Sequence, residues 1–332
     1  MGNLLIKKQE ISEDMLSAID TFMQDSNFLW SDMSTLKYLL HVLNASGSHQ
    51  ILVYDGDAII GCNFFVYAPA RINKKTTTIA WSNSTFLSPS YRKYVGLDLF
   101  FSVYNSKNVM GFGVTDINFK LLSLASANFI ATSHGFRLRN DLYDDTQPSS
   151  SLTYPPDLFI KGKHFKKVNK ASEIRAPKDG SWNRDMVVDF IRDTNFINKR
   201  FFKTPWKYMI YRMNMNDAPV DDLYFACRIR KNRGVQTLFL VDYRFKNDKV
   251  QGMNDVIEAL YQLSVINNIK ECMIFSTLST QLYTKRGKLE KFGEEVHIIS
   301  NIKNINPESV MITPADSDCD LIPLNLCNKI SQ

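Results

Sequence analysis

The chain has 332 residues, 44% of them hydrophobic and 22% charged, a composition that excludes a disordered chain and allows two globular domains. Its formal net charge of +6 suits an anionic small ligand but is too small to indicate nucleic acid as a partner. No apolar run approaches the roughly 18 residues of a membrane span, so membrane insertion is not expected.

Cysteine and histidine usage points to neither disulfides nor metal. The five cysteines contain no C-x-x-C pair and the five histidines are scattered, so we expect no disulfide framework and no metal site. A reducing, cytoplasmic environment fits this pattern best.

The first residues predict two helices followed by strands. Ser12-Glu13-Asp14 is typical of a helix start, and an apolar stripe at helical spacing follows it. Asp55-Gly56-Asp57 separates two runs rich in strand-forming residues, which favours a tight hairpin. The predicted elements are a helix carrying Met15, Ile19, Phe22 and Met23, a helix at 33–43, and strands at 50–54, 58–67 and 79–87.

A short basic loop then joins strand to helix. Ser88-Pro89-Ser90 stops the strand, and apolar residues recur at helical spacing from Gly96, so a helix is expected to begin near Tyr94 or Gly96. Free amide groups at that helix start, together with Arg92 and Lys93, suit a phosphate or pyrophosphate. The alternative is an ordinary strand-to-helix turn with two solvated cations.

The following residues complete one unit and lead to a second. A strand at 109–117 and a helix at 119–133, ended by Gly135, are predicted. Proline, serine and lysine accumulate between 146 and 181, so we place a domain boundary there, although 157–168 still predicts a strand.

The second half repeats the element order of the first. Its predicted elements are helices at 185–194, 204–213, 253–266 and 282–292, strands at 223–230, 234–243, 271–277 and 309–313, and a polar loop at 244–252. Equal order in two halves favours a duplicated α/β unit.

Two short motifs resemble those of the Gcn5-related N-acetyltransferase (GNAT) fold. Ser90-Tyr91-Arg92-Lys93-Tyr94-Val95-Gly96-Leu97 is similar in character to the family's Q/R-x-x-G-x-G/A loop, and His134-Gly135-Phe136 is similar to the end of a family helix. The whole chain resembles tandem members that acylate amino sugars or aminoacylate cell-wall precursors. The resemblance implies an α/β (α+β) fold of two GNAT-like domains, each a mostly antiparallel mixed sheet flanked by helices. Domain 1–168 would bind acyl-CoA, and domain 169–332 would bind the acceptor or be structural.

In that family the loop after the fourth strand holds the pyrophosphate of acyl-CoA, which would be a cosubstrate here. The resemblance also implies that backbone amides near Phe86 and Leu87 hold the thioester and polarise its carbonyl. The residues expected to bind acyl-CoA are Phe86, Leu87, Ser88, Arg92, Lys93, Tyr94, Val95, Gly96 and Leu97.

Acyl transfer to an amine needs a route for the proton, and one carboxylate or imidazole is sufficient. Asp318, Asp316 and His134 are the catalytic candidates. The alternatives are aspartates of a solvated turn or cap, and a histidine at a helix end.

The acceptor is expected to contact a basic, aromatic segment. Cations interleaved with rings suit a pyrophosphate and a base, and the expected residues are Trp206, Lys207, Tyr208 and Arg212. The alternative is an amphipathic helix with core aromatics and solvent-facing cations.

The resemblance favours an N-acyltransferase that acylates a nucleotide-activated, dTDP-linked deoxyamino sugar for surface polysaccharide (lipopolysaccharide) synthesis. We expect direct attack in a ternary complex by a monomer or weak dimer. Two other classes stay open: a Fem-like aminoacyl or peptidyl transferase, and a non-catalytic tandem GNAT ligand-binding protein.

Overall fold

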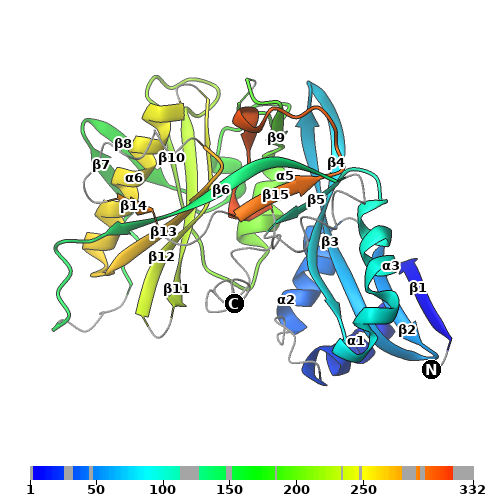
Figure 1. Ribbon diagram of the computed structural model, residues 1–332. Coiled ribbons are helices and arrows are strands. Elements are labelled where there is room, and N and C mark those ends of the chain that lie inside the picture. The colour runs from blue at the N-terminus through cyan, green and yellow to red at the C-terminus, as the bar shows by residue number, and fades with distance from the viewer. Residues whose placement is uncertain are drawn as a thin grey trace.

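The molecule consists of two halves built on one continuous sheet. The computed structural model describes residues 3–25, 33–44, 48–112, 127–146, 152–183, 185–232, 235–246, 249–278, 289–291 and 296–316. Figure 1 shows the halves side by side, each with strands and covering helices. Within these ranges no helix combines the length and the apolar character needed to cross a membrane.

The first half is a sheet with helices on both faces. Apolar residues of its first helix, such as Ile19, pack on one face, and Leu99 of its third helix packs on the other. Its elements are β1 (Leu4–Gln9), α1 (Glu13–Asp25), α2 (Met33–Lys37), the π-helical turn η1 (Tyr38–Leu43), β2 (Gln50–Asp55), β3 (Ala58–Ile72), β4 (Lys75–Leu87), the 3-10 turn η2 (Pro89–Tyr91), α3 (Arg92–Tyr104) and β5 (Val109–Phe112).

The second half repeats this plan around one long helix. Val256 and Leu260 of that helix lie in the hydrophobic core on one face of its sheet. Its elements are β7 (Asp157–Ile160), β8 (Lys163–Lys167), η3 (Ala171–Glu173), β9 (Val188–Phe190), α5 (Thr194–Ile197), η4 (Asn198–Phe202), β10 (Met209–Met213), β11 (Leu223–Asn232), β12 (Val235–Phe245), α6 (Lys249–Ile266), β13 (Glu271–Ser276), β14 (Leu289–Lys291), β15 (Val296–Ser300), η6 (Pro307–Ser309), β16 (Val310–Met311) and η7 (Pro314–Asp316).

The repeated order predicted for the two halves is present in the sheet. Strands β2, β3 and β4 are antiparallel and β4 pairs with β5 in parallel, as β10, β11 and β12 are antiparallel and β12 pairs with β13 in parallel. Helices α3 and α6 make the two crossover connections. The mixed, mostly antiparallel α/β architecture is therefore confirmed.

A shared strand, β6 (Asn128–Arg139), interleaves the halves (Figure 1). Its residues 128–133 pair with β15, and its residues 134–139 pair with β13. Strand β15 in turn pairs with β5, so a strand from residues 296–300 completes the first sheet. The sequence ranges 1–168 and 169–332 stay a prediction, and the sheets themselves exchange strands across that boundary.

Several predicted helices are wrong. Residues 128–133 of the helix at 119–133 lie in β6, which runs through Gly135, and 119–126 lie outside the described residues. Strands β9 and β10 replace predicted helices at 185–194 and 204–213, and β14 occupies the end of the one at 282–292, whose residues 282–288 are not among those described. Strand β10 is buried on both faces, so its residues show no alternation that would distinguish strand from helix.

Two arginines and two aspartates, all fully buried, join the halves. Arg192, just after β9, contacts Asp242 of β12 through Nε at 2.8 Å and also binds Asp316. Arg244 of β12 lies 3.0 Å from Asp242 and 3.5 Å from Asp316. Strand β9 belongs by sequence to the second half of the chain, but it pairs with β3 of the first sheet. The contacts of Arg192 with β12 therefore join the first sheet to the second.

Burial and the arginine charges balance differently at two aspartates of this region. Burial alone would raise the pKa of Asp242, but the guanidinium groups of Arg192 and Arg244 outweigh it and hold that pKa below its ordinary value of 3.8. At nearby Asp189, whose Oδ1 lies 3.8 Å from Arg244 Nε, burial outweighs the cations and raises the pKa. Asp242 therefore stabilises the junction as a carboxylate, whereas ionised Asp189 destabilises the folded state.

Asp242→Asn is expected to lower the free energy of unfolding by about 3 to 5 kcal/mol at neutral pH, because it leaves Arg192 buried with too little counter-charge. Asp189→Asn, the matched control, should cost much less. Urea unfolding at several pH values checks both. The stability contributed by Asp242 is present above pH 3.8 and lost as pH falls towards its lower folded-state pKa. The free energies of unfolding of wild type and of Asp242→Asn should therefore converge in acid. Equal losses for the two variants would contradict this account.

Candidate functional site

The candidate site lies at the end of β4, beyond its described pairing with β5. Among the described residues, Ala80–Ser82 of β4 pair with Val109–Gly111 of β5, and β4 continues to Leu87. A bulge interrupts the other edge of β4, since Cys62 faces Phe86 but Phe64 faces Asn83. Bulges bend a strand and often occur beside ligand sites. The last residues of β4 therefore have backbone groups that are not paired to β5 in the described part of the chain.

Polar side chains gather beside this bulge. Asn63 Oδ1 accepts hydrogen bonds from Ser82 Oγ at 2.7 Å and from Thr85 Oγ1 at 2.6 Å. Ser82 is also hydrogen-bonded to Tyr104, whose pKa is raised by burial. A side chain at Gly111 would approach the Tyr104 hydroxyl to 2.5 Å, so glycine is needed there. This polar group lies between the sheet and α3, within an otherwise apolar layer.

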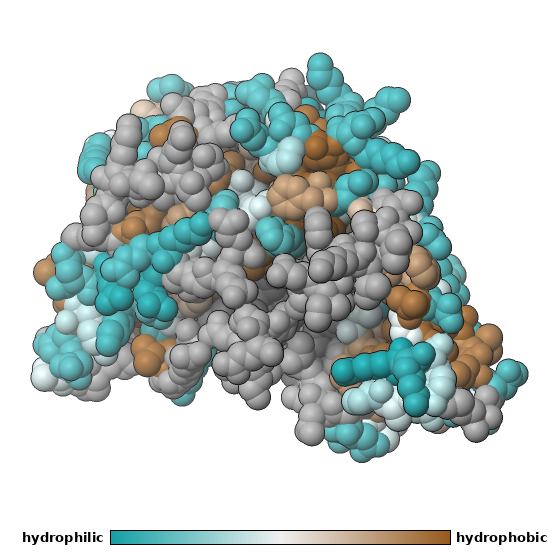
Figure 2. All heavy atoms as spheres, viewed as in Figure 1, coloured by the Kyte–Doolittle hydropathy of each residue, from teal (hydrophilic) through white to brown (hydrophobic). Residues whose placement is uncertain are grey.

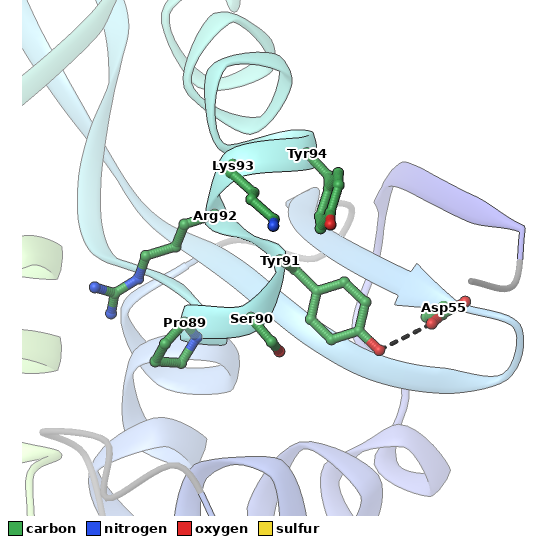
Figure 3. Close-up of a pocket in the computed structure, with 7 residues that line it drawn as sticks. All are labelled: Asp55, Pro89, Ser90, Tyr91, Arg92, Lys93 and Tyr94. Carbon is green, nitrogen blue, oxygen red and sulfur yellow. Dashed lines mark hydrogen bonds between the residues drawn. The ribbon is translucent and has the colours of Figure 1, made fainter.

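The loop after β4 forms an open hollow at the start of α3. The Ser88 amide donates to the Ile60 carbonyl at 2.9 Å, which fixes the loop to β3. No side chain caps the first turn of α3, and the amides of Tyr91 and Arg92 donate to the carbonyls of Ser88 and Pro89, so it is the positive end of the helix dipole that borders the hollow. The hollow has a volume of about 830 Å³ and is lined by Asp55, Pro89, Ser90, Tyr91, Arg92, Lys93 and Tyr94 (Figure 3).

The two basic side chains of the loop point in different directions (Figure 3). Arg92 turns back, and its Nε donates to the Leu87 carbonyl at 3.1 Å. Lys93 lies beside the Tyr94 ring, with Nζ 4.8 Å from the ring centre. Tyr91 donates to Asp55 Oδ2 at 2.9 Å, and this hydrogen bond raises the pKa of Tyr91. Lys93 is thus available to an anion in the hollow, and Arg92 to one at the end of β4.

At the start of α6, the corresponding place in the second half, an aromatic ring lies against the helix. Gly252 near the start of α6 lies under the Phe245 ring, which a side chain at that position would approach to 2.7 Å. Gly96 of α3 has only a Leu87 methyl carbon nearby, at 4.0 Å. The first loop therefore leaves room above the helix start that the aromatic ring fills in the second.

The other residues predicted for this loop divide between core and surface. Leu87 and Val95 are buried between the sheet and α3, and Phe86 packs edge-on against Phe22 of α1. Tyr94 and Leu97 are exposed. The structure thus brings the backbone of this segment and the side chains of Ser88, Arg92, Lys93 and Tyr94 to one surface.

Two of the predicted acceptor residues form a stack between the halves. Trp206 packs edge-on against Tyr38 of η1, at 5.3 Å between ring centres. The Arg228 guanidinium lies 5.4 Å from the Trp206 ring centre and 5.8 Å from that of Tyr208, whose hydroxyl accepts from Arg200 Nη1 at 2.9 Å. This is a half-buried aromatic and cationic surface.

The remaining acceptor candidates are not part of that stack. Lys207 is exposed. Arg212 lies in β10 and pairs with Asp221 at 2.9 Å. Because 209–213 is a strand, Trp206 and Arg212 do not share a helical face.

The three predicted bases lie in different places. Asp316 is 1% exposed, and Oδ1 and Oδ2 both face arginines, contacts that favour a structural role. His134 is half-buried in β6, at the residue where this strand passes from β15 to β13. Asp318 lies outside the described residues. Their part in proton transfer stays a prediction. Among the residues placed in the structure, no three His, Cys, Asp or Glu side chains are grouped as a metal would require.

Sequence analysis missed Asn63, Asp55 as a wall of the hollow, and the buried Arg192 and Asp242. Asn63 had a detectable signal, because it is the single strongly polar residue in the apolar run 58–68. Asp55 was assigned to a turn, which is also correct, and only the folded structure brings that turn next to Tyr91.

Comparison with known proteins shows the fold. No family model and no curated protein matches the sequence. The structure is similar to N-myristoyltransferase from Saccharomyces cerevisiae, with a TM-score of 0.59 and 8% identity over 94% of this chain and 84% of that one. It is also similar to a GCN5-related N-acetyltransferase from Anabaena variabilis (TM-score 0.56, 8% identity, 89% and 72% covered) and to a probable N-acyltransferase from Enterococcus faecalis (0.55, 8%, 90% and 72%). The expected GNAT-like fold is therefore confirmed over most of the chain.

Proposed function

We propose that the protein is an N-acyltransferase that moves an acyl group from acyl-CoA to an amine. The observation that carries this proposal is the bulge at the end of β4 directly before the start of α3, in a fold shared with N-acyltransferases. One ligand with a pyrophosphate at one end and a carbonyl at the other suits both features. The Phe245 ring beside Gly252 supports binding in the first half alone.

The residues of this segment would divide the work. The positive end of the α3 dipole and Lys93 would hold the phosphates, because a helix start and an ammonium group both favour anions. The backbone near Phe86 and Leu87 would hold the thioester and polarise its carbonyl. Binding both substrates together would let the amine attack directly, so no covalent enzyme intermediate is needed.

For the acceptor we propose a nucleotide-linked amino sugar, with a dTDP sugar as the first choice. Trp206 and Tyr208 offer rings for a base, and Arg228 and Lys207 offer charge for phosphates. These residues border Tyr38 of the first half, so the acceptor would lie between the halves. His134 or Asp318 would take the proton, directly or through water.

Lys93→Ala combined with Arg92→Ala is expected to weaken acyl-CoA binding about tenfold or more, since charge-assisted hydrogen bonds contribute about 1.5–3 kcal/mol each. Calorimetry with acetyl-CoA measures it. Lys246→Ala is the matched control, because Lys246 is an exposed lysine at the end of β12 in the corresponding loop. A larger loss in the Lys246 variant would move the site to the second half.

Thiol release with a panel of acyl-CoAs and amines tests the reaction and the acceptor class. The panel contains dTDP- and UDP-linked amino sugars and a peptide with a free N-terminus. Release is expected with the nucleotide sugars, and Trp206→Ala should raise the KM for the sugar at least several-fold while leaving acyl-CoA affinity unchanged. Release with the peptide alone would contradict the acceptor assignment. If no amine gives release, the proposal that the protein is an N-acyltransferase is contradicted.

A further inference from the structure

Asn63 is a buried amide with half of its hydrogen bonds missing. It is completely buried in β3, and its Oδ1 accepts from Ser82 and Thr85 of β4. Among the residues that the structure describes, its Nδ2 has no hydrogen-bond partner. A buried donor without an acceptor costs free energy, so each such group in a folded protein calls for a physical reason.

A second buried asparagine nearby has a partner for each of its two polar side-chain atoms. Asn44 is 3% exposed, its Nδ2 donates to the Phe65 carbonyl at 2.8 Å, and its Oδ1 accepts from the Tyr67 amide at 2.8 Å. Asn44 thus binds to the backbone of β3, whereas Asn63, within β3, uses only its oxygen among the described residues.

The position of Asn63 makes it reachable from the proposed ligand site. The residue above it, Thr85, is exposed, and the loop that begins at Ser88 follows three residues later, roughly 10 Å along an extended strand. Thr85 lies beyond the described pairs of β4 with β5. A ligand that runs from the loop back along β4 would therefore cross the Thr85 side chain and the amide beneath it.

The surroundings of the amide indicate the chemistry of its partner. Among the described side chains, Asn63 contacts the hydroxyls of Ser82 and Thr85, Tyr104 is hydrogen-bonded to Ser82, and the core cluster on this face of the sheet is apolar. A neutral donor in such a place suits a neutral acceptor such as a carbonyl oxygen, not a phosphate, which needs charge or a helix start.

We propose that Asn63 Nδ2 donates a hydrogen bond to a carbonyl oxygen in the pantetheine and thioester arm of acyl-CoA, with Ser82 and Thr85 fixing the amide in place. Asn63 is thus a binding residue that selects ligands carrying this arm. The assignment rests on the proposed function, because it presumes the same ligand in the same groove.

The test compares two ligands on three proteins. Acetyl-CoA carries the arm, and adenosine 3′,5′-bisphosphate is its nucleotide end without the arm. Calorimetry gives both affinities for wild type, for Asn63→Leu and for the control Asn44→Leu, and urea unfolding confirms that each is folded. The affinity of Asn63→Leu for acetyl-CoA is expected to fall about tenfold, as for one lost hydrogen bond, and its affinity for the nucleotide to stay unchanged. Asn44→Leu should be less stable and change both affinities by the same factor.

The outcomes separate this inference from the proposed function. If wild type binds both ligands and Asn63→Leu keeps their affinity ratio, the inference is overturned and the function stands. If wild type binds neither, both are overturned. Should the leucine variant not fold, Asn63→Ser keeps an oxygen for the two hydroxyls, lacks the amide donor, and is judged by the same ratio.

Discussion

The pairing of Arg192 with Asp242 and Asp316 holds the two halves of the molecule in one arrangement. These charges have no contact with solvent, and each would be costly to bury alone. Together they join the turn after β9, strand β12 and the turn after β16, which belong to different parts of the sheet. The Tyr38 hydroxyl donates to the carbonyls of Lys199 and Arg200 in η4, which positions its ring edge-on against Trp206.

Strand exchange and the charged junction have the same consequence for function. The acceptor site proposed between the halves keeps its shape only if neither half moves independently, and β6 ties the two sheets together through backbone hydrogen bonds. On the face seen in Figure 2, the hydrophobic residues lie in separate patches among hydrophilic ones, since the cores of both halves are inside. The bulge at the end of β4 is then a local feature of this joined frame.

The sequence predicted those parts of the fold that depend on neighbouring residues. Asp55-Gly56 marked the hairpin of β2 and β3, with Gly56 at a positive φ of 60°, and Ser88-Pro89 marked the end of β4. It could not predict that β15 inserts between β5 and β6, because that pairing joins residues more than 150 positions apart. Strand β10 resembled a helix because both of its faces are buried. For the site, the sequence located the loop but not Asn63 or the closure of the second loop by Phe245, which depend on contacts across strands.

The central claim is that acyl-CoA binds the first half, at the end of β4. Hydrogen–deuterium exchange of the full chain, with and without acetyl-CoA, tests it most directly because exchange reports protection segment by segment. The account predicts that the ligand slows exchange in peptides covering Phe86–Leu97 and leaves those covering Phe245–Gly252 unchanged. Protection at Phe245–Gly252 instead, or in neither segment at saturating ligand, would contradict it.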